Sequence, residues 1–443
     1  MIVIIGAGLA GLTCARQLVQ ASQQVLVLEA TGRVGGRVRT EMNAEGYRLD
    51  QGFQVLFTAY PSAKRHLNYD ELKQRKFEPG AILVKDGKRY EIADPLREPD
   101  RIVAGLLNPL ISPADKLRVL RLRTHVMGLS TADIFAGKGQ PDRGDESTEQ
   151  YLRRLGFEEQ GFIDHFARPF YGGIFLDRSL ATSARMFQFT FKMLATGDTI
   201  IPAEGMQRIP EQLATTLPQG SVRYFAPVEE LLVAEGKVRG VRLAGGEMIE
   251  ADTVVVATDS PAAARLTGMA LPARAVGSVC LYFAGDERLY AQRKILLNAD
   301  PHAYVNNAVL ITNIAPTYAP PRKHLLSVTV LDEPEGDDEL IAHRCISEMA
   351  GWFPEHDLSG WKFLAAFRIP FSQFAQPPGI YDSLPGYRTS TEGLYLAGEY
   401  TKSSSIQGAM HSGEDAAQAI MRAREAAANA IPPEKFPPSG QLR

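Results

Sequence analysis

The chain has 443 residues, of which 45% are hydrophobic and 22% charged, a balance typical of a globular protein with a large buried core. Its formal net charge of −3 provides no basic field to attract nucleic acid, so we expect no nucleic-acid partner. The three cysteines and eight histidines show no disulfide or metal-ligand spacing, and no apolar run reaches the ~18 residues of a transmembrane helix, so we expect a cytoplasmic protein without a metal.

The amino terminus has the pattern of one β-α-β unit. Residues Ile2–Ile5 form a short apolar run of the kind found in buried parallel strands. A glycine-rich turn follows, then helical periodicity over Leu12–Val19 and a second apolar run, Val25–Leu28. We therefore expect a strand, a tight turn, a helix and a second strand that ends at Glu29.

The turn between the first strand and the helix has the glycine spacing of a dinucleotide site. Gly6 permits the tight turn, Gly8 lets the backbone approach a pyrophosphate, and Gly11 lets the helix pack close to the strand. Leu9 and Ala10 lie in the first turn of the helix, where free N–H groups and the helix dipole would face the phosphates. Because a strand precedes and a helix follows, we expect this turn to bind a dinucleotide.

An acidic residue and an arginine loop follow the second strand. Glu29 can accept hydrogen bonds from a ribose diol and would repel a 2′-phosphate, which disfavours NADP. After Ala30, the pair Gly35-Gly36 permits another close approach of the backbone, and Arg37 can pair with phosphate oxygens in a fixed fork geometry. The position of this loop directly after the strand indicates that it belongs to the same site.

The pattern changes further along the chain. Asp86-Gly87 predicts a hairpin, and residues 100–200 are mainly helical in character, interrupted by prolines. A buried strand is expected at Asp252–Ala257, strands with one helix over 275–385, and a last strand at 393–397 before a helix over 408–427. The segments expected to form a β-meander are Val222–Val228, Glu230–Ala234 and Val238–Leu243.

This layout indicates an α/β protein with two interleaved domains. We expect the dinucleotide-type segments 1–60, 200–265 and 385–430 to form one Rossmann-type domain. Residues 61–199 and 266–384 would form an α+β substrate-binding domain, and residues 431–443 a C-terminal tail.

The glycine motif, followed by Glu-Ala and four residues later by Gly-Gly-Arg, resembles the signature of the FAD-dependent amine oxidase superfamily. Its members include amine oxidases, protoporphyrinogen oxidases and phytoene desaturases. The resemblance continues in order along nearly the whole chain and implies FAD bound in a GR2-type domain, in which a β-meander accompanies the parallel sheet. It implies a helix that begins at Gly408 and directs its positive end at the flavin. The further residues that it assigns to the flavin site are Gly52, Phe53, Gln54, Val228, Gly398, Glu399, Gln407, Gly408, Ala409 and Met410.

Two departures from the superfamily pattern bear on the substrate. Amine oxidases place a lysine near flavin N5, on the strand that resembles Val276–Phe283, but Ser278 or Val279 stands there in this chain. The stretch 403–407 also lacks the aromatic residue that walls their amine cage. Both absences argue against amine oxidation. Leu56–Pro61 and Ala397–Lys402 are most similar to plant- and cyanobacterial-type carotenoid desaturases.

The resemblance therefore implies an FAD-dependent oxidoreductase that desaturates or dehydrogenates an apolar, isoprenoid- or polyene-like substrate by hydride transfer to flavin N5. Oxygen or a quinone would then accept the electrons. One alternative is an amine or protoporphyrinogen-type oxidase that uses oxygen. Another is a flavin-free, prenyl-binding escort protein, against which Glu29, Arg37 and Glu399 argue. The superfamily chemistry needs no particular side-chain acid or base, and none is assigned as catalytic.

Three further features have two interpretations each. Gln54, Tyr400 and His411 are expected near the flavin ring as structural or catalytic groups. The apolar stretch Ile102–Leu110, with the cations at 116–123, either rests on a membrane surface, which would make the protein peripheral to a membrane, or forms an ordinary helix pair. A set of phenylalanines either lines a substrate tunnel or forms ordinary core. These are Phe162, Phe166, Phe170, Phe175, Phe187, Phe189 and Phe191.

Overall fold

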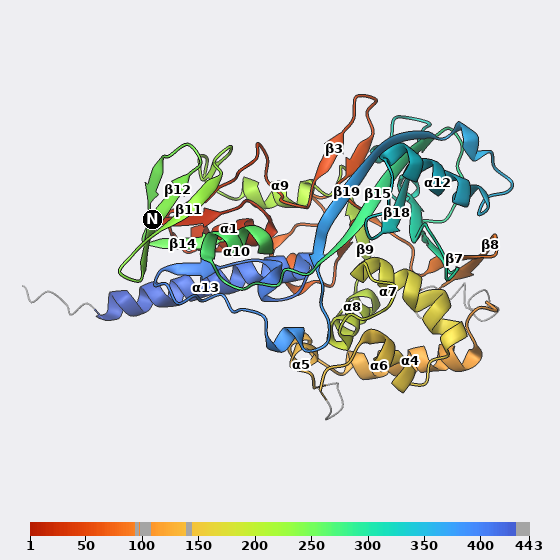
Figure 1. The fold of residues 1–443 in the computed structure, drawn as a ribbon, viewed down its shortest axis with the longest axis horizontal. Coiled ribbons are helices and arrows are strands. Elements are labelled where there is room, and N and C mark those ends of the chain that lie inside the picture. Colours follow the sequence, from red (N-terminus) through yellow and green to blue (C-terminus); the bar gives the residue numbers. More distant parts are fainter. Residues whose placement is uncertain (94–96, 98–107, 139–143, 431–443) are drawn as a thin grey trace, which may run out of the picture.

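The computed structural model describes residues 1–93, 97, 108–138 and 144–430. One layer is a five-stranded parallel sheet built from both ends and the middle of the chain (Figure 1). Strands β1 and β14 of this sheet are fully buried, which suits their apolar, β-branched composition. The strand order is β10 (Val222–Arg223), β2 (Val25–Leu28), β1 (Ile2–Ile5), β14 (Thr253–Val256) and β20 (Leu394–Leu396).

Two helices from opposite ends of the chain pack side by side next to this sheet. Helix α1 (Leu9–Gln20) follows β1, and α13 (Ile406–Ala430) lies against it (Figure 1). They approach closely at Gly413, where a Cβ atom would lie 2.3 Å from the carbonyl oxygen of Ala10. The helices run in the same direction, because Arg424 of α13 bonds Gln23 beyond the end of α1. Their N-termini therefore point the same way.

The sequence prediction for residues 222–228 is wrong in one respect. Val222 and Arg223 do not belong to the meander but pair with β2 at the edge of the parallel sheet. Phe225 then adopts a positive φ of 52°, and Pro227 has no N–H to donate, so no strand can continue through this turn. The meander is β11 (Val228–Ala234), β12 (Lys237–Leu243) and β13 (Met248–Glu250).

The second large layer is a mixed seven-stranded sheet whose two faces carry different cores. On β15, Val279, Leu281 and Phe283 pack with α12 (Asp338–Ala350). Cys280 and Tyr282 face the opposite side. This alternation follows the two-residue period of a strand. The order is β19 (Lys362–Phe374), β15 (Ala275–Gly285), β18 (His324–Leu331), β17 (Asn307–Leu310), β16 (Ile295–Asn298), β7 (Ala81–Lys85) and β8 (Lys88–Ile92).

A group of helices lies below this sheet in Figure 1. Pro113 and Pro169 stand in first turns, so these prolines begin helices rather than break them. The group comprises α4 (Pro113–Met127), α5 (Thr131–Phe135), α6 (Thr148–Arg154), the π-helix η2 (Glu159–Ala167), α7 (Arg168–Phe175) and α8 (Ala184–Thr196). The predicted hairpin at Asp86-Gly87 joins β7 to β8.

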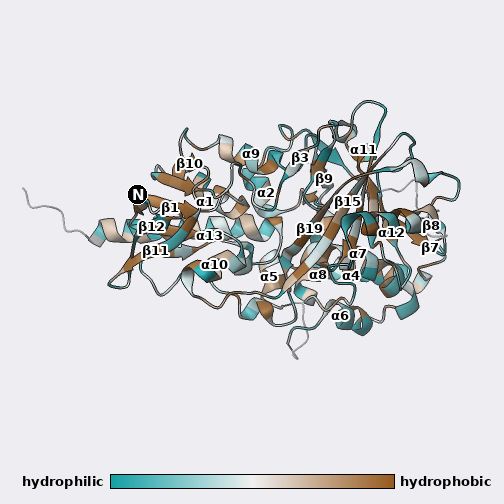
Figure 2. Cartoon of the chain, turned by 45° about the horizontal axis from the view of Figure 1, so that its top comes forward, coloured by the Kyte–Doolittle hydropathy of each residue, from teal (hydrophilic) through white to brown (hydrophobic). Residues whose placement is uncertain are grey.

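Short elements connect these parts, and Figure 2 shows hydrophobic strands in both large sheets. Among the described residues, no helix is both long and apolar enough to cross a bilayer. The short strands are β3 (Thr40–Met42), β4 (Arg48–Asp50), β5 (Leu56–Phe57), β6 (Gln74–Lys76) and β9 (Thr199–Pro202). The short helices are α2 (Pro61–His66), α9 (Arg208–Thr215), α10 (Ser260–Thr267), α11 (Ile311–Ile314), η3 (Pro316–Tyr318), η4 (Leu358–Gly360), η5 (Ile380–Asp382) and η6 (Glu399–Thr401).

Candidate cofactor and substrate site

A cavity of about 980 Å³ extends from the β1–α1 turn to the helices below the seven-stranded sheet. We call its two ends the nucleotide arm and the apolar arm. The nucleotide arm is lined by the β1–α1 turn, the end of β2 and the start of α13, and the apolar arm by η2, α7, α8 and the sheet. The residues assigned from the sequence that line the cavity are Gly6, Gly8, Leu9, Ala10, Glu29, Ala30, Gly35, Gly36, Arg37, Gly52, Phe53, Gln54, Val228, Gly398, Glu399 and Ala409.

Four assigned residues lie behind this surface. A Cβ atom on Gly11 would lie 2.0 Å from Gly6 O, and one on Gly408 would lie 1.9 Å from Ser403 O, so both glycines allow close backbone packing. Met410 is fully buried in the core. Gln407 points to α2, where its Oε1 accepts from the N–H of Ser62 at 2.9 Å and its Nε2 donates to Ser62 Oγ at 2.9 Å.

The β1–α1 turn presents bare backbone to the cavity. Gly6 has a φ of 104°, a region that favours glycine, and a Cβ atom on Gly8 would meet no atom within 4 Å. Helix α1 has no side-chain cap and no acidic residue in its first turn. Its first N–H groups and the positive end of its dipole are therefore available to an anion in the nucleotide arm.

Glu29 is held in one orientation by the surrounding backbone. Its Oε2 accepts from the N–H of Ala7 at 3.0 Å. Its Oε1 accepts from the N–H of Thr31 at 2.9 Å and from the Thr31 hydroxyl at 2.7 Å. Thr31 thus helps to orient this carboxylate, a role that was not predicted from the sequence.

Arg37 and Glu399, which both line the cavity, form an ion pair. Arg37 Nη2 lies 2.6 Å from Glu399 Oε1, and its Nη1 donates to Ser372 O at 2.8 Å. Burial raises the pKa of Glu399, and the adjacent Arg37 opposes that rise. The pair joins the loop after β2 to the segment after β20, two stretches more than 300 residues apart.

The buried amide oxygen Oε1 of Gln54, a cavity-lining residue, has no hydrogen-bond partner among the described residues. Its Nε2 donates to Arg37 O at 2.9 Å, so the side chain is oriented by another contact. Buried groups of this kind are normally paired, which fits a polar ligand at this point.

The other two groups expected near the ring do not line the cavity. Tyr400 is fully buried and donates to Val256 O at 3.3 Å. His411 is 45% exposed and lies beside Asp415. The question between Ser278 and Val279 is resolved by the alternation of β15, because Ser278 lines the cavity whereas Val279 packs on the α12 side.

The predicted set of phenylalanines divides between the two interpretations. Phe162, Phe166, Phe170 and Phe191 line the apolar arm. The rings of Phe166 and Phe170 stack with centroids 5.0 Å apart, which makes a continuous aromatic wall. The other three, Phe175, Phe187 and Phe189, are buried in the core.

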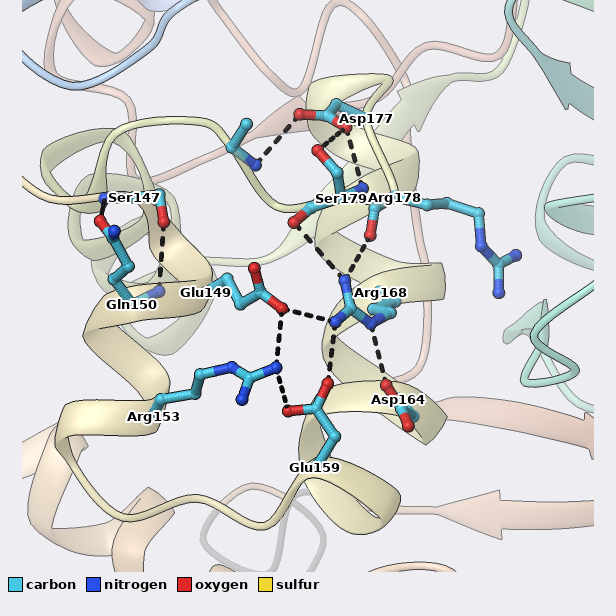
Figure 3. Close-up of polar contacts among 11 residues, drawn as sticks. Ser147, Glu149, Gln150, Arg153, Glu159, Asp164, Arg168, Asp177, Arg178 and Ser179 are labelled. Carbon is cyan, nitrogen blue, oxygen red and sulfur yellow. Dashed lines mark hydrogen bonds and ion pairs between the residues drawn. The ribbon is translucent and has the colours of Figure 1, made fainter.

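An ionic cluster holds this aromatic wall from behind (Figure 3). Arg168 donates to Glu149 Oε1 at 2.7 Å and Glu159 Oε1 at 3.0 Å, and its Nε donates to Asp164 Oδ1 at 2.9 Å. These contacts join α6, the π-helix η2 and α7. Because η2 carries two of the cavity phenylalanines, Arg168 fixes the position of the wall.

Polar side chains in the apolar arm were not predicted from the sequence. Thr329 of β18 and Asn307 of β17 line the cavity beside apolar neighbours. Ser327 and Thr329 stand at alternate positions among apolar residues of β18, and that alternation is the local signal of a polar residue on this face of the strand.

A Rossmann-type sheet whose cavity continues into an apolar arm is the architecture of an enzyme that brings a dinucleotide cofactor to a second ligand. The profile of flavin-containing amine oxidoreductases matches residues 9–421. The chain therefore belongs to this family and is an FAD-dependent oxidoreductase.

The chain is also similar to individual members of the superfamily. It is 25% identical over 469 residues to the 15-cis-phytoene desaturase of Solanum lycopersicum, covering 95% of this chain and 77% of that one. It is 24% identical over 484 residues to the zeta-carotene desaturase of Synechocystis, covering 95% and 97%. The structure of a putrescine oxidase has the same fold, with a TM-score of 0.72, 18% identity and coverage of 95% and 98%.

Proposed function

We propose that the chain dehydrogenates an apolar, isoprenoid- or polyene-like molecule with FAD as the hydride acceptor. The observation that carries this proposal is the continuity between the nucleotide arm and an arm walled by Phe162, Phe166 and Phe170. The similarity to phytoene and zeta-carotene desaturases supports the same substrate class. Bound FAD supplies a two-electron acceptor at N5, and the protein contributes position and exclusion of water.

The lining residues have chemistry that fits FAD. In this proposal the α1 N-terminus holds the pyrophosphate, Glu29 accepts from the adenosine ribose, and Val228 lies beside the adenine. The unpartnered Gln54 Oε1 receives a polar group of the flavin end. Segments 1–60, 200–265 and 385–430 would then form the FAD-binding domain, and segments 61–199 and 266–384 the substrate-binding domain.

Amine oxidation has less support. Ser278 occupies the cavity-facing position on β15, so no lysine lies where amine oxidases place one. The segment before α13 lines the cavity with Ser404, Ser405 and Ile406 rather than with an aromatic ring. Neither β15 nor the segment before α13 supplies the aromatic cage that a substrate ammonium would require.

The decisive experiment is anaerobic reduction of the purified holoprotein, followed at the flavin absorbance near 450 nm. We expect polyene or isoprenoid candidates to bleach the flavin and amines to leave it oxidised. Bleaching by amines with peroxide release in air would replace this proposal with an amine oxidase. A colourless protein that takes up no FAD would instead favour an escort protein. Reoxidation by oxygen or by a soluble quinone would identify the electron acceptor.

We also propose that the substrate enters from a membrane surface. Helix α4 exposes Leu117, Leu120 and Met127, and Leu120 also lines the cavity, so an apolar surface adjoins the apolar arm. Most of the apolar stretch 102–110 lies outside the described residues. Co-sedimentation with anionic vesicles at low salt tests this proposal, with Leu117→Glu/Leu120→Glu as the variant that should remain in solution. Failure of the parent protein to bind such vesicles would refute it.

A further inference from the structure

The wall of the apolar arm contributed by the seven-stranded sheet carries a row of polar side chains. Thr329 of β18 lies opposite Cys280 of β15 on one side and Asn307 of β17 on the other. Thr329 is 5% exposed and Asn307 3%, yet both line the cavity. Polar groups buried in an apolar chamber require hydrogen-bond partners.

These side chains end a hydrogen-bond chain that starts at a half-buried cation. Arg178 Nη1 donates to Asn306 Oδ1 at 3.2 Å, and Asn306 Nδ2 donates to Asn307 Oδ1 at 2.9 Å. Asn307 Nδ2 then donates to Thr329 Oγ1 at 3.2 Å. Figure 3 shows the Arg178 guanidinium pointing away from the Arg168 cluster, so it does not share the carboxylates there.

The direction of this chain is set by its fixed ends. A guanidinium only donates, so the oxygen of Asn306 must face Arg178. The nitrogen of Asn306 also donates to the carbonyl oxygen of Pro169 at 3.1 Å, and a carbonyl only accepts. Both Asn306 atoms are thereby assigned, and the orientation of Asn307 follows from its neighbour.

The last member of the chain has a proton to give. Thr329 Oγ1 accepts from Asn307, and within the described part of the molecule its hydroxyl donates to no protein acceptor. Bonds that all point one way polarise one another, so a chain that begins at Arg178 strengthens the terminal hydroxyl as a donor.

We propose that the apolar arm binds an oxygenated apolar molecule, whose carbonyl or other acceptor oxygen receives the hydrogen bond of the Thr329 hydroxyl. This inference rests on the proposed function, because it names the class of molecule held in that arm. Thr329 is diagonal to Ser278 across β15 and β18, a separation of about 7–8 Å between such residues. The oxygen would therefore lie along the same stretch of cavity wall as Ser278.

Binding of matched ligands to the holoprotein tests this directly. Farnesyl acetone, a ketone, and farnesene, a hydrocarbon, are compared by equilibrium dialysis, which requires no turnover. We expect Thr329→Val to weaken ketone binding about 3- to 10-fold, the loss of one hydrogen bond, and to leave farnesene binding the same or tighter. Thr329→Ser keeps the hydroxyl and should restore the preference for the ketone.

Thr190→Val is the matched control, because Thr190 also lines the cavity but lies on α8, away from the Arg178 chain. It should change ketone and hydrocarbon affinities together. If Thr329→Val also changes both together, or the parent protein does not prefer the ketone, the inference is overturned. If the ketone preference and its loss are seen but no apolar molecule bleaches the flavin, the proposed reaction fails and the inference stands.

Discussion

Replacement of Glu29 by glutamine should weaken FAD binding sharply. The two carboxylate oxygens receive three protein donors, from Ala7 N–H on one oxygen and from the Thr31 N–H and hydroxyl on the other. A carboxamide has one acceptor oxygen, so its NH₂ group must face one of these sets of donors. The ribose diol would also exchange a charge-assisted bond for a neutral one, a loss of roughly 1.5–3 kcal/mol. This corresponds to about 10- to 150-fold in affinity.

The assay is a titration of the apoprotein with FAD, followed by quenching of flavin fluorescence. Glu41→Gln is the control, because Glu41 is 43% exposed, pairs with Arg33 and does not line the cavity. We expect that variant to bind FAD within about twofold of the parent, since exposed ion pairs contribute little. An unchanged affinity in Glu29→Gln would show that the β2 carboxylate does not contact the cofactor.

Three further perturbations test the packing around the cavity. Glu414 forms hydrogen bonds with His66 and Arg65, and its pKa is lowered to about 2 from an ordinary 4.5. The ionised carboxylate therefore stabilises the folded chain above pH 4.5, and this stability is lost as the pH falls toward 2. In urea unfolding, Glu414→Gln should show a weaker loss of stability in acid than the parent protein. Gly11→Ala should cost about 1–3 kcal/mol in thermal or urea unfolding, because its Cβ would overlap Gly6 O, whereas Gly245→Ala meets no atom and should be silent. Arg168→Met should lower the melting temperature and weaken apolar ligand binding. Arg153→Met is the control and should have smaller effects, because Arg153 is 55% exposed. Equal effects of the two substitutions would contradict the role given to Arg168.

Local signals predicted most of the strands because each signal is contained within a few residues. The β1–α1–β2 unit follows directly from its apolar runs and glycines, and α12 lies within the stretch 275–385 where one helix was expected. Residues 222–228 show what such signals omit. Alternating residues look the same in a meander and at the edge of a parallel sheet, and the partner of β10 is β2, about two hundred residues earlier. No local pattern specifies that pairing.

The residues of the candidate site also divide into those that local sequence predicts and those that depend on distant contacts. The glycines and Glu29 were predicted because their roles depend on neighbours in sequence. Gln407 was placed in the flavin site, but its orientation is decided by Ser62, 345 residues away. The hydrogen-bond chain from Arg178 to Thr329 joins a loop after α7 to strands β17 and β18. Each of its residues alone looks like an ordinary polar side chain. Only the folded structure shows that the hydrogen bonds from Arg178 to Thr329 all point the same way.

The direction of the hydrogen bonds that end at Thr329 bears on which arm of the cavity selects the substrate. Catalysis by a bound flavin needs little from side chains, so substrate choice must come from the shape and polarity of the apolar arm. Aromatic walls alone discriminate poorly between apolar molecules of similar size, by about 1–3 kcal/mol per methylene. A buried donor discriminates more strongly, because a hydrocarbon leaves it unpaired in a dry chamber while an oxygenated molecule satisfies it. Selection against a plain hydrocarbon would therefore arise at Thr329, by the cost of an unmade bond, and not at the rings that contact most of the ligand.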